Sequence, residues 1–462
     1  MFFKFKDVIS QKKPSIFFIV LVMAAIIFSP LKKISSQPNI SSVNHVEWSS
    51  NKTIYEVNLR QYTKAGTFKE FEKHLPRLKE LGVGILWFMP LHPIGEKNRK
   101  GTLGSYYSVK DYLAVNPEFG TMGEFKSLVK KIHEMGMKVI IDWVANHTAW
   151  DNNLINEHPD WFTKDSLGKF LPPVADWQDV VDLNYDNKDL RKYMIEALKF
   201  WIEKCDIDGY RCDVAGMVPT DFWIEARKEL DKIKPVFMLA EWDSPELHQA
   251  FDMTYDWKVY KTFNAIAKGE KNLDSLRMIF KEDSLKFPDN AIRMEFTSNH
   301  DENTWNGTVF ERLGKSVKTF AAFTFLIPGM PLIYSGQEAA MNKRLDFFEK
   351  DLINWDDFKF EDFYKTLVKL KKENKALLCG SKGGKLVEIS SSNKKEIFAF
   401  VREKGNEKIF AVFNFSDRQQ NINLNGKVMA GDYSEVFTTE KKSLKNYESF
   451  SLRPWEFKIF IK

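Results

Sequence analysis

Cysteine is scarce in this chain, and the chain has neither internal repeats nor a long basic stripe. Three cysteines among 462 residues, Cys205, Cys212 and Cys379, do not make a disulfide framework. We expect Cys205 and Cys212 to be small buried apolar groups, and a bridge between these two is the alternative. The sequence shows no internal repeat of a diagnostic length, which argues against repeat architectures. It also has no long basic stripe, so nucleic-acid binding through clustered phosphate contacts is not expected.

The net positive charge belongs to the N-terminal segment alone. The formal charge is +5, and six lysines with one aspartate in residues 1–38 account for all of it. An apolar run of 13 residues, Ile16–Phe28, follows Lys12 and Lys13. A membrane-spanning helix needs about 20 residues, so the run fits the core of an export signal. We expect export to the periplasm or the extracellular space. Residues 1–38 would then consist of a linker preceded by either a cleaved signal peptide or a retained anchor at residues 16–28. The protein contacts a membrane only if the apolar segment is retained.

From Thr53 onward, strand-like and helix-like segments alternate. Strands such as Gly82–Phe88 are apolar throughout, as expected of a strand covered on both faces, and capping boxes at Thr67 and Thr121 begin helices. Repeated right-handed βα units close into a barrel when about eight of them follow one another. The fold class is therefore α/β, a (β/α)8 TIM barrel over residues 39–377. The expected strands are Thr53–Asn58, Gly82–Phe88, Lys138–Val144, Asp208–Asp213, Val236–Glu241, Asp252–Asp256, Ile292–Ser298 and Pro331–Ser335.

Two regions depart from this alternation. Residues 148–185 are rich in proline, asparagine and aspartate without a clean helical period, and they predict a short excursion domain after the third strand, overhanging the barrel mouth. After residue 378 the apolar residues recur at every second position, as in Ile397–Val401, with turn residues between the runs. Short strands with turn signals predict a separate C-terminal antiparallel β-sandwich over residues 378–462.

Four acidic residues, Asp142, Asp213, Glu241 and Asp301, stand where predicted strands end. In a (β/α)8 barrel these strand ends meet at one mouth. Breaking a glycosidic bond needs a carboxylate that attacks or stabilises an oxocarbenium-like carbon and a neutral carboxylic acid that protonates the leaving oxygen. Asp213, Glu241 and Asp301 are a set of this kind.

The neighbours of these residues suggest how they divide the work. Arg211 lies two residues before Asp213 on one strand, so both side chains face the mouth. A guanidinium lowers the pKa of a nearby carboxyl group, and we expect an ionised Asp213 suited to nucleophilic attack; a structural ion pair is the alternative. Glu241 follows the apolar run Val236–Ala240, a setting that favours the neutral form a general acid needs; the alternative is a polar residue that ends a strand.

Four segments in this order resemble the signature regions of the α-amylase family of glycoside hydrolases. They are Asp142–His147, Gly209–Asp213, Glu241 after its apolar strand, and Asn299–Asp301. The resemblance covers roughly residues 50–380 and includes the supporting segment Gly329–Glu338.

This resemblance implies roles for individual residues. Asp213 would be the nucleophile, Glu241 the general acid/base and Asp301 the stabiliser of the transition state in a retaining double displacement. Such a mechanism predicts carboxyl groups of Asp213 and Glu241 about 5–5.5 Å apart. Five further residues would bind or position the sugar at the scission point: Tyr107, Asp142, His147, Arg211 and His300. Candidate sugar platforms, with core or loop packing as the alternative for each, are Trp143, Trp150, Trp177, Trp242 and Trp305.

The chain departs from the family pattern at one place. Many starch-cleaving members carry Lys-His shortly after the nucleophile, where this chain has Val214–Met217. Binding on the leaving-group side must therefore be built differently. The same histidine helps to bind calcium in the family, and only Asn146 and Asp182 match other calcium ligands, so a calcium site here would be partial.

The sequence thus predicts an exported, monomeric enzyme acting on α-glucans or maltooligosaccharides. An exo-acting α-glucosidase and a 4-α-glucanotransferase share the same machinery and stay open. A membrane-anchored, inactive barrel of the transporter-associated type is the alternative from another class, although all three acidic residues are present. Neither endo or exo action nor the choice between α-1,4 and α-1,6 bonds follows from the sequence.

Overall fold

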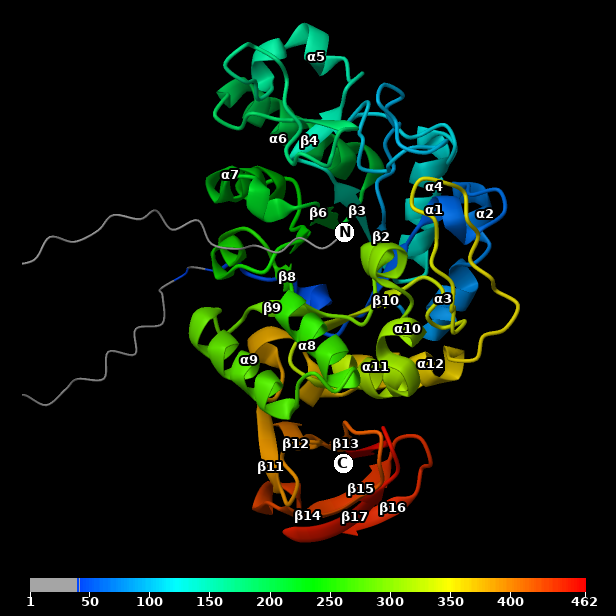
Figure 1. Cartoon of the computed structure of the whole chain (residues 1–462), viewed down its shortest axis with the longest axis vertical. Coiled ribbons are helices and arrows are strands. Elements are labelled where there is room, and N and C mark those ends of the chain that lie inside the picture. The colour runs from blue at the N-terminus through cyan, green and yellow to red at the C-terminus, as the bar shows by residue number, and fades with distance from the viewer. Residues whose placement is uncertain (1–39, 41) are drawn as a thin grey trace, which may run out of the picture. The chain divides into compact units, whose positions relative to one another are not determined.

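Eight short parallel strands close into a barrel in the computed structural model, which describes residue 40 and residues 42–462 (Figure 1). Around the ring the order is β1, β10, β9, β8, β7, β6, β3, β2. The strands are β1 (Ile54–Val57), β2 (Ile85–Phe88), β3 (Lys138–Trp143), β6 (Gly209–Cys212), β7 (Phe237–Ala240), β8 (Met253–Tyr255), β9 (Ile292–Glu295) and β10 (Met330–Tyr334). The predicted TIM barrel is confirmed, and seven strands lie inside their predicted segments, whereas β10 begins one residue before its segment.

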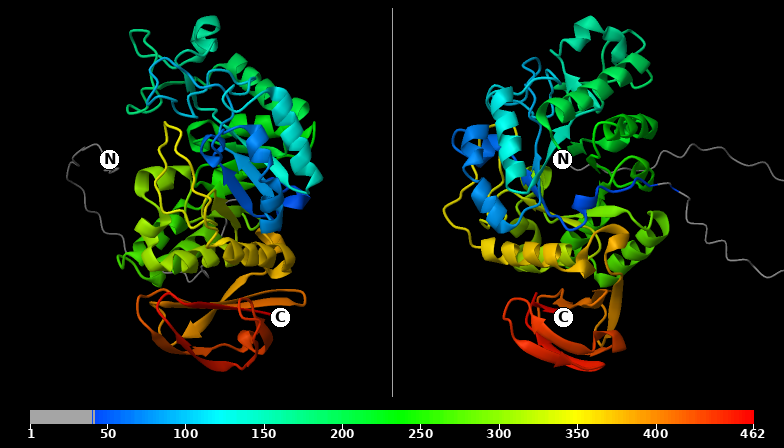
Figure 2. Two further views of the ribbon diagram at one scale, coloured as in Figure 1. Left: turned by 90° about the vertical axis from the view of Figure 1, so that its right-hand side faces the viewer. Right: turned by 180° about the vertical axis from the view of Figure 1, so that it is seen from behind.

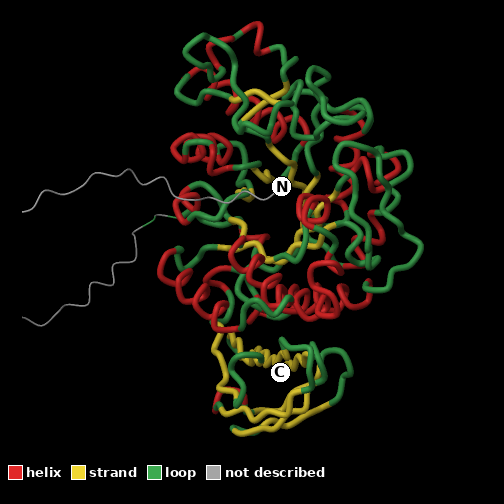
Figure 3. Tube along the Cα trace, in the orientation of Figure 1, coloured by secondary structure: helices red, strands yellow, loops and turns green. Residues whose placement is uncertain are grey.

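Helices cover the outside of the barrel (Figures 2 and 3). They are α1 (Leu59–Tyr62), α2 (Phe68–Glu72), α3 (Leu75–Leu81), α4 (Met122–Glu134), α6 (Lys188–Cys205), α7 (Thr220–Asp231), α8 (Trp257–Ala267), α9 (Leu273–Lys286), α10 (Val309–Leu313), α11 (Val317–Leu326) and α12 (Glu361–Glu373). At the start of α4 the Thr121 side chain accepts a hydrogen bond from the Glu124 N–H and the Glu124 side chain accepts one from the Thr121 N–H, which completes the expected capping box.

Apolar side chains fill the barrel and a segment of chain closes its N-terminal end. Val46, which precedes β1, is buried among the residues that fill the barrel interior. The ring of Trp48 lies 5.8 Å from that of Phe237, the first residue of β7, and Lys138, the first residue of β3, lies over its face. Because this end is closed, ligands reach the barrel from the carboxyl ends of the strands.

The excursion after β3 is small and mostly irregular. It contains β4 (His147–Ala149), α5 (Leu154–Glu157) and β5 (Val180–Asp182), and β4 pairs with β5 in an antiparallel ribbon. His147 lies opposite Asp182 in this ribbon. The excursion therefore carries a residue from the end of β3 directly over the mouth.

The C-terminal region is an antiparallel sheet of eight strands in the order β16, β15, β18, β13, β12, β11, β14, β17. In Figures 1 and 2 it lies beside the barrel, beyond α9, α11 and α12 and on the side away from the excursion. Rings of Phe323 in α11 and Phe413 lie 5.1 Å apart and join the sheet to the helical layer. The strands are β11 (Leu386–Ser391), β12 (Ile397–Lys404), β13 (Glu407–Asn414), β14 (Gln420–Asn425), β15 (Gly431–Glu435), β16 (Lys441–Leu444), β17 (Tyr447–Leu452) and β18 (Phe457–Ile461).

Two sequence predictions concern groups away from the mouth. Cys205 and Cys212 are buried and free, as expected, and Cys379 is buried and free as well. Within the part of the chain that the structure describes, no helix combines the length and the apolar character needed to cross a membrane. The apolar run Ile16–Phe28 lies outside the described residues, so the expected signal or anchor stays a prediction.

Candidate active site

The predicted site residues meet at the carboxyl ends of the barrel strands. Asp213 directly follows β6, and Glu241 directly follows β7. Asp301 begins the loop after β9, next to His300. Side chains alternate between the two faces of a strand. When the residue before the strand end faces the helices, the next side chain therefore points into the mouth.

Arg211 is the centre of the site and is fully buried. Its Nη1 atom lies 2.8 Å from Asp142 Oδ1 and 3.1 Å from Asp213 Oδ1. Its Nη2 atom lies 2.8 Å from Glu241 Oε1, a close ion pair without the alignment of a hydrogen bond. One guanidinium therefore holds three carboxyl groups that are distant in the sequence.

The crowding of carboxyl groups reverses the ionisation expected for Asp213. Burial, and next the charge of Glu241, raise the pKa of Asp213 well above its usual value, and Arg211 offsets only part of this. The expectation of a lowered pKa is therefore wrong, because one guanidinium is shared among three acids away from water. Burial also raises the pKa of Asp142 to about 6. Burial therefore favours the protonated forms of Asp213 and Asp142 over their ionised forms.

The apolar setting expected for Glu241 is also wrong. Besides the ion pair with Arg211, its Oε2 atom accepts a hydrogen bond from the Val214 N–H at 2.9 Å. The apolar residues of β7 that precede it are buried in the barrel wall, whereas Glu241 itself turns into the polar mouth. Both carboxyl oxygens are held, which fixes the direction of the group.

Asp301 is the most open of the three acids, with 36% of its side chain exposed against 10% for Asp213 and Glu241. Its Oδ2 atom lies 3.3 Å from His300 Nε2. Although burial opposes the change, Asp301 and Glu56 raise the pKa of His300 well above its usual value. Burial opposes the effect on Asp301 as well, but the His300 imidazolium lowers the pKa of Asp301. Asp301 is therefore the carboxylate that stays ionised.

Glu56, at the end of β1, was missed in the sequence and is completely buried. Its Oε1 atom lies 2.5 Å from His300 Nδ1, on the side of the ring opposite Asp301. Two carboxyl groups thus bracket one imidazole. The signal was present, because Glu56 is the single charged residue of the four in a fully buried strand.

Tyr107 and Asp142 form the wall behind the acids. The Tyr107 hydroxyl lies 3.1 Å from Asp142 Oδ2 and 2.8 Å from His300 Nε2. Asp142 is fully buried and also accepts a hydrogen bond from the Trp87 indole at 3.2 Å. Asp142 therefore lies behind Arg211 and Tyr107 and contacts both of them.

His147 lies on the excursion side of the mouth. Its Nε2 atom is 3.9 Å from Asp213 Oδ2, and its ring centre is 5.4 Å from that of Trp177. Burial lowers the pKa of His147 to about 3, so the imidazole is neutral. A neutral ring therefore lies beside Asp213 without adding charge, at a distance too long for a hydrogen bond.

The segment where Lys-His is missing has its own construction. Val214 has a φ of 35°, and a Cβ atom added at Gly216 would lie 2.2–2.3 Å from three atoms of the Trp242 indole. Gly216 is therefore required for Trp242 to lie against this loop. Trp242 directly follows Glu241 and is 38% exposed. An aromatic face thus borders the position that the absent pair would occupy.

The five candidate tryptophans separate into three groups by their exposure. Trp143 is fully buried at the end of β3, with its ring 5.2 Å from that of Tyr112, so its proposed role as a sugar platform is wrong. Asp142 faces the mouth, and its neighbour must face the helices. Trp150 and Trp177 are partly buried, whereas Trp242 and Trp305 are exposed by 38% and 54%.

Asn146 and Asp182 lie close together where β4 pairs with β5. The Leu183 N–H donates to the Asn146 carbonyl oxygen at 3.1 Å. Calcium takes about six to eight oxygen ligands. Among the described residues no group of three or more histidine, cysteine, aspartate or glutamate side chains is arranged to hold a metal ion. The donor set does not fit a complete calcium site, and no step of the chemistry below depends on one.

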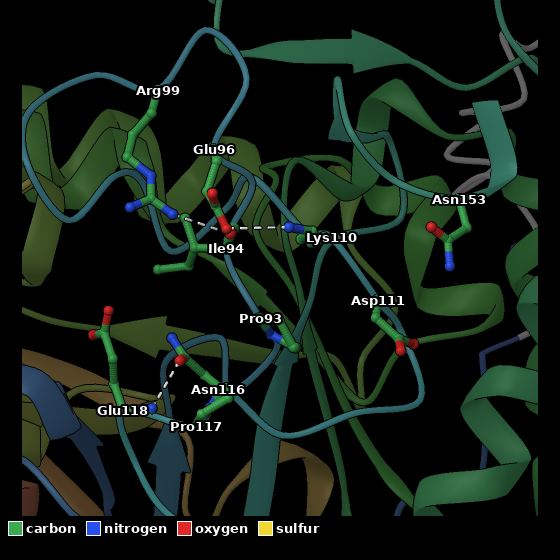
Figure 4. A pocket seen from close by; sticks show the side chains of 10 residues that line it. All are labelled: Pro93, Ile94, Glu96, Arg99, Lys110, Asp111, Asn116, Pro117, Glu118 and Asn153. Carbon is green, nitrogen blue, oxygen red and sulfur yellow. Dashed lines mark hydrogen bonds and ion pairs between the residues drawn. The ribbon is translucent and has the colours of Figure 1, made fainter. Parts of the chain in front are cut away.

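A separate cavity of about 550 Å³ lies beside the loop between β2 and α4 (Figure 4). Its charged groups already have partners, since Lys110 pairs with Glu96 at 3.2 Å and Arg99 donates to the Gly95 carbonyl oxygen at 2.8 Å. It contains none of the predicted site residues. The candidate active site is the mouth around Arg211.

Comparison with known proteins gives a consistent result. The family model for the catalytic domain of alpha amylase matches residues 48–169 and 161–379. The model for the C-terminal domain of the alpha-amylase SusG matches residues 397–456. Together they span the barrel and most of the C-terminal sheet.

Individual relatives agree with the family models. A maltogenic α-amylase from Thermotoga neapolitana shares the fold with a TM-score of 0.81 and 33% identity, over 89% of this chain and 99% of that one. An α-amylase from Lactobacillus plantarum gives 0.80 and 33% over the same shares. A cyclomaltodextrinase from Thermoanaerobacter pseudethanolicus is 28% identical over 75% of this chain and 63% of its own length.

Proposed function

The chain belongs to the α-amylase family of glycoside hydrolases, and from this premise we propose that it cleaves α-glucosidic bonds of maltooligosaccharides and starch-type glucans with retention of configuration. One observation carries the proposal. Arg211 binds Asp213 and Glu241 at the same time, so the two acids that a double displacement requires lie side by side in one mouth. His300 holds the third acid, Asp301, beside them.

In the proposed reaction Asp213 attacks the anomeric carbon and Glu241 protonates the glycosidic oxygen that leaves. The covalent glycosyl-enzyme is then opened by water, and Glu241 takes the proton back. Asp301 stays ionised through its contact with His300 and stabilises the positive charge on the sugar. Retention further predicts carboxyl groups of Asp213 and Glu241 about 5–5.5 Å apart when substrate is bound.

The raised pKa of Asp213 supports a proposal for where the proton lies before and during the reaction. Before the substrate binds, burial and the charge of Glu241 favour the protonated form of Asp213. Positive charge developing at the anomeric carbon favours an ionised Asp213, and the proton then belongs on Glu241, which passes it to the leaving oxygen. We expect the acid limb of kcat/KM to report the set as a whole.

Trp242 offers a surface for the leaving group in place of the absent Lys-His pair. Its exposed indole adjoins Glu241 and lies on Gly216, so a sugar ring leaving from Glu241 has an apolar face to lie against. The same platform would hold an acceptor sugar where water must otherwise attack. This favours a 4-α-glucanotransferase as the second candidate function. Exo-acting α-glucosidase activity stays open as well.

Product analysis tests the proposal. The purified enzyme is incubated with amylose, pullulan, maltotriose and isomaltose, and the products are separated by size; longer products from maltotriose identify transfer. Proton NMR in the same tube reads the anomer formed first. Asp213→Asn should abolish turnover, whereas Glu295→Gln, which changes a buried glutamate away from the mouth, should not. A product of inverted configuration excludes a nucleophilic Asp213.

Two expectations from the sequence are carried forward as proposals. We propose that residues 1–38 direct export, which fractionation of cells with detection of the full-length and shortened chain would test. We further propose that any calcium bound at Asn146 and Asp182 binds weakly, since these two residues supply few of the oxygen ligands needed.

A further inference from the structure

Three aromatic rings run outward from the centre of the mouth. Tyr107, which stacks on His300, lies 6.1 Å from Phe347 with the ring planes inclined by 17°. Phe347 in turn lies 5.5 Å from Trp305 at 38°. We call these three residues the aromatic shelf. It connects the buried wall of the catalytic site with the solvent.

Trp305 is unusual for its exposure. It is the most exposed of the candidate tryptophans at 54%, whereas a ring of this size is normally well buried. Its indole N–H is nevertheless near enough to Asp301 to help lower the pKa of that carboxyl group, after the larger effect of His300. One edge of the residue thus lies near a catalytic acid, while the ring face is left for a ligand.

Hydrogen bonds hold the outer rings in place. Trp305 lies in a π-helical turn, η5 (Glu302–Asn306), and Phe347 lies in the loop after β10. The Thr304 hydroxyl donates to the Leu345 carbonyl oxygen at 2.7 Å, and the Leu345 N–H donates to Asn303 Oδ1 at 2.9 Å. These bonds tie the two segments together, so the shelf is formed before any ligand arrives.

The position of the shelf decides which part of a substrate it meets. Trp305 and Phe347 follow β9 and β10, and Tyr107 follows β2. Glu241, the proposed proton donor to the leaving group, follows β7 on the other arc of the closed ring. The shelf therefore lies on the side of the scission point away from the leaving group.

We propose that Trp305 and Phe347 bind the glucosyl unit that precedes the one attacked by Asp213, with the apolar face of its pyranose ring against the indole. This inference rests on the proposed function and names a determinant of its substrate preference. The contact also reaches the chemistry, because Trp305 packs on Phe347, Phe347 packs on Tyr107, and the Tyr107 hydroxyl contacts His300. Binding energy from a non-reacting unit is then used in the transition state, so shortening the substrate lowers kcat and not only affinity.

Two chromogenic substrates test the shelf. p-Nitrophenyl α-glucoside fills only the unit at the scission point, and p-nitrophenyl α-maltoside adds the preceding unit with the same leaving group. We expect Trp305→Ala to lower kcat/KM for the maltoside by roughly 10- to 30-fold more than for the glucoside. Trp305→Phe keeps a ring but loses the N–H. This variant should lower kcat/KM for both substrates. The ratio of kcat/KM for the maltoside to kcat/KM for the glucoside should stay within about threefold of the wild-type ratio, roughly the effect of one modest contact.

Binding without turnover gives a second reading. In the Asp213→Asn background, isothermal titration with maltotriose should show Kd raised roughly 10-fold by Trp305→Ala. Tyr447→Ala, which removes an equally exposed ring from the C-terminal sheet, is the matched control and should change nothing. An unchanged maltoside-to-glucoside ratio together with an unchanged Kd overturns the shelf. A wild-type enzyme that cleaves neither substrate contradicts the proposed function, and the titration still decides the shelf.

Discussion

Replacing Glu56 by glutamine tests whether the buried carboxylate behind His300 takes part in catalysis. Glu56 is completely buried and its Oε1 atom lies 2.5 Å from His300 Nδ1. The change keeps the shape of the side chain and removes its charge. His300 then loses one of the two carboxyl groups that raise its pKa.

The size of the effect follows from the contact that is lost. A hydrogen bond between charged groups contributes about 1.5–3 kcal/mol, which corresponds to roughly 10- to 100-fold in rate if the contact serves the transition state. We therefore expect kcat to fall by roughly that factor in Glu56→Gln. The pKa of His300 is raised in the wild type, so the protonated ring persists to high pH. Removing Glu56 lowers this pKa, and the alkaline limb of kcat/KM should move to lower pH.

The assay combines a pH–rate profile with NMR of the histidine side chains, which reports the ionisation of His300 directly. Glu295→Gln is the control, since Glu295 is also buried in the barrel but its charged neighbours are Asp256, Arg293, Asp283 and Lys371. A Glu56→Gln enzyme with an unmoved alkaline limb and an unmoved His300 titration would refute the reasoning. A Glu56→Asp variant, which restores the charge, should recover part of the rate.

Three further changes have expected outcomes. Asp213→Asn should raise the thermal unfolding temperature at pH 7, measured by calorimetry. Burial and Glu241 raise the pKa of Asp213 in the folded state, so at a pH above the pKa of the unfolded chain its charge lowers the stability of the fold. A lower unfolding temperature would contradict the crowding of the carboxyl groups. Gly216→Ala should displace Trp242 and cost about 1–3 kcal/mol of unfolding free energy in denaturant titrations, and a wild-type stability would show that the indole moves freely. Adding calcium to chelator-treated enzyme should shift the unfolding temperature by no more than roughly 2 °C, since weak binding stabilises little; a large shift would reveal ligands that Asn146 and Asp182 do not supply.

The positions of the three acids could be predicted from the sequence because they depend on local order alone. Asp213 and Glu241 directly follow buried strands, and the carboxyl ends of all strands in a closed parallel barrel meet at the same mouth. The outward direction of Trp143 was predictable for the same reason, since Asp142 beside it faces inward. The alternation of side chains along a strand determines both directions, and the prediction for Trp143 was wrong because this rule was not applied to it.

The division of charge could not be predicted in this way. Arg211 is adjacent in the sequence to Asp213 alone, and the sequence therefore suggests one ion pair. Only the closed barrel brings Asp142 and Glu241 to the same guanidinium. The contact of Gly216 with Trp242 is likewise a property of two neighbouring loops, and so is the pairing of Glu56 with a histidine 244 residues away.

This arrangement of charge explains why the site is suited to a cationic intermediate. Asp142, Asp213, Glu241, Asp301 and Glu56 gather around Arg211 and His300, so acidic groups outnumber the basic ones in a nearly closed space. In the free enzyme this excess is relieved by retaining a proton, which is the meaning of the raised pKa of Asp213. When the anomeric carbon becomes positive, the sugar itself supplies the missing charge, and the fixed groups stabilise it without having to reorganise. The electrostatic strain of the empty site and the stabilisation of the transition state therefore have the same origin.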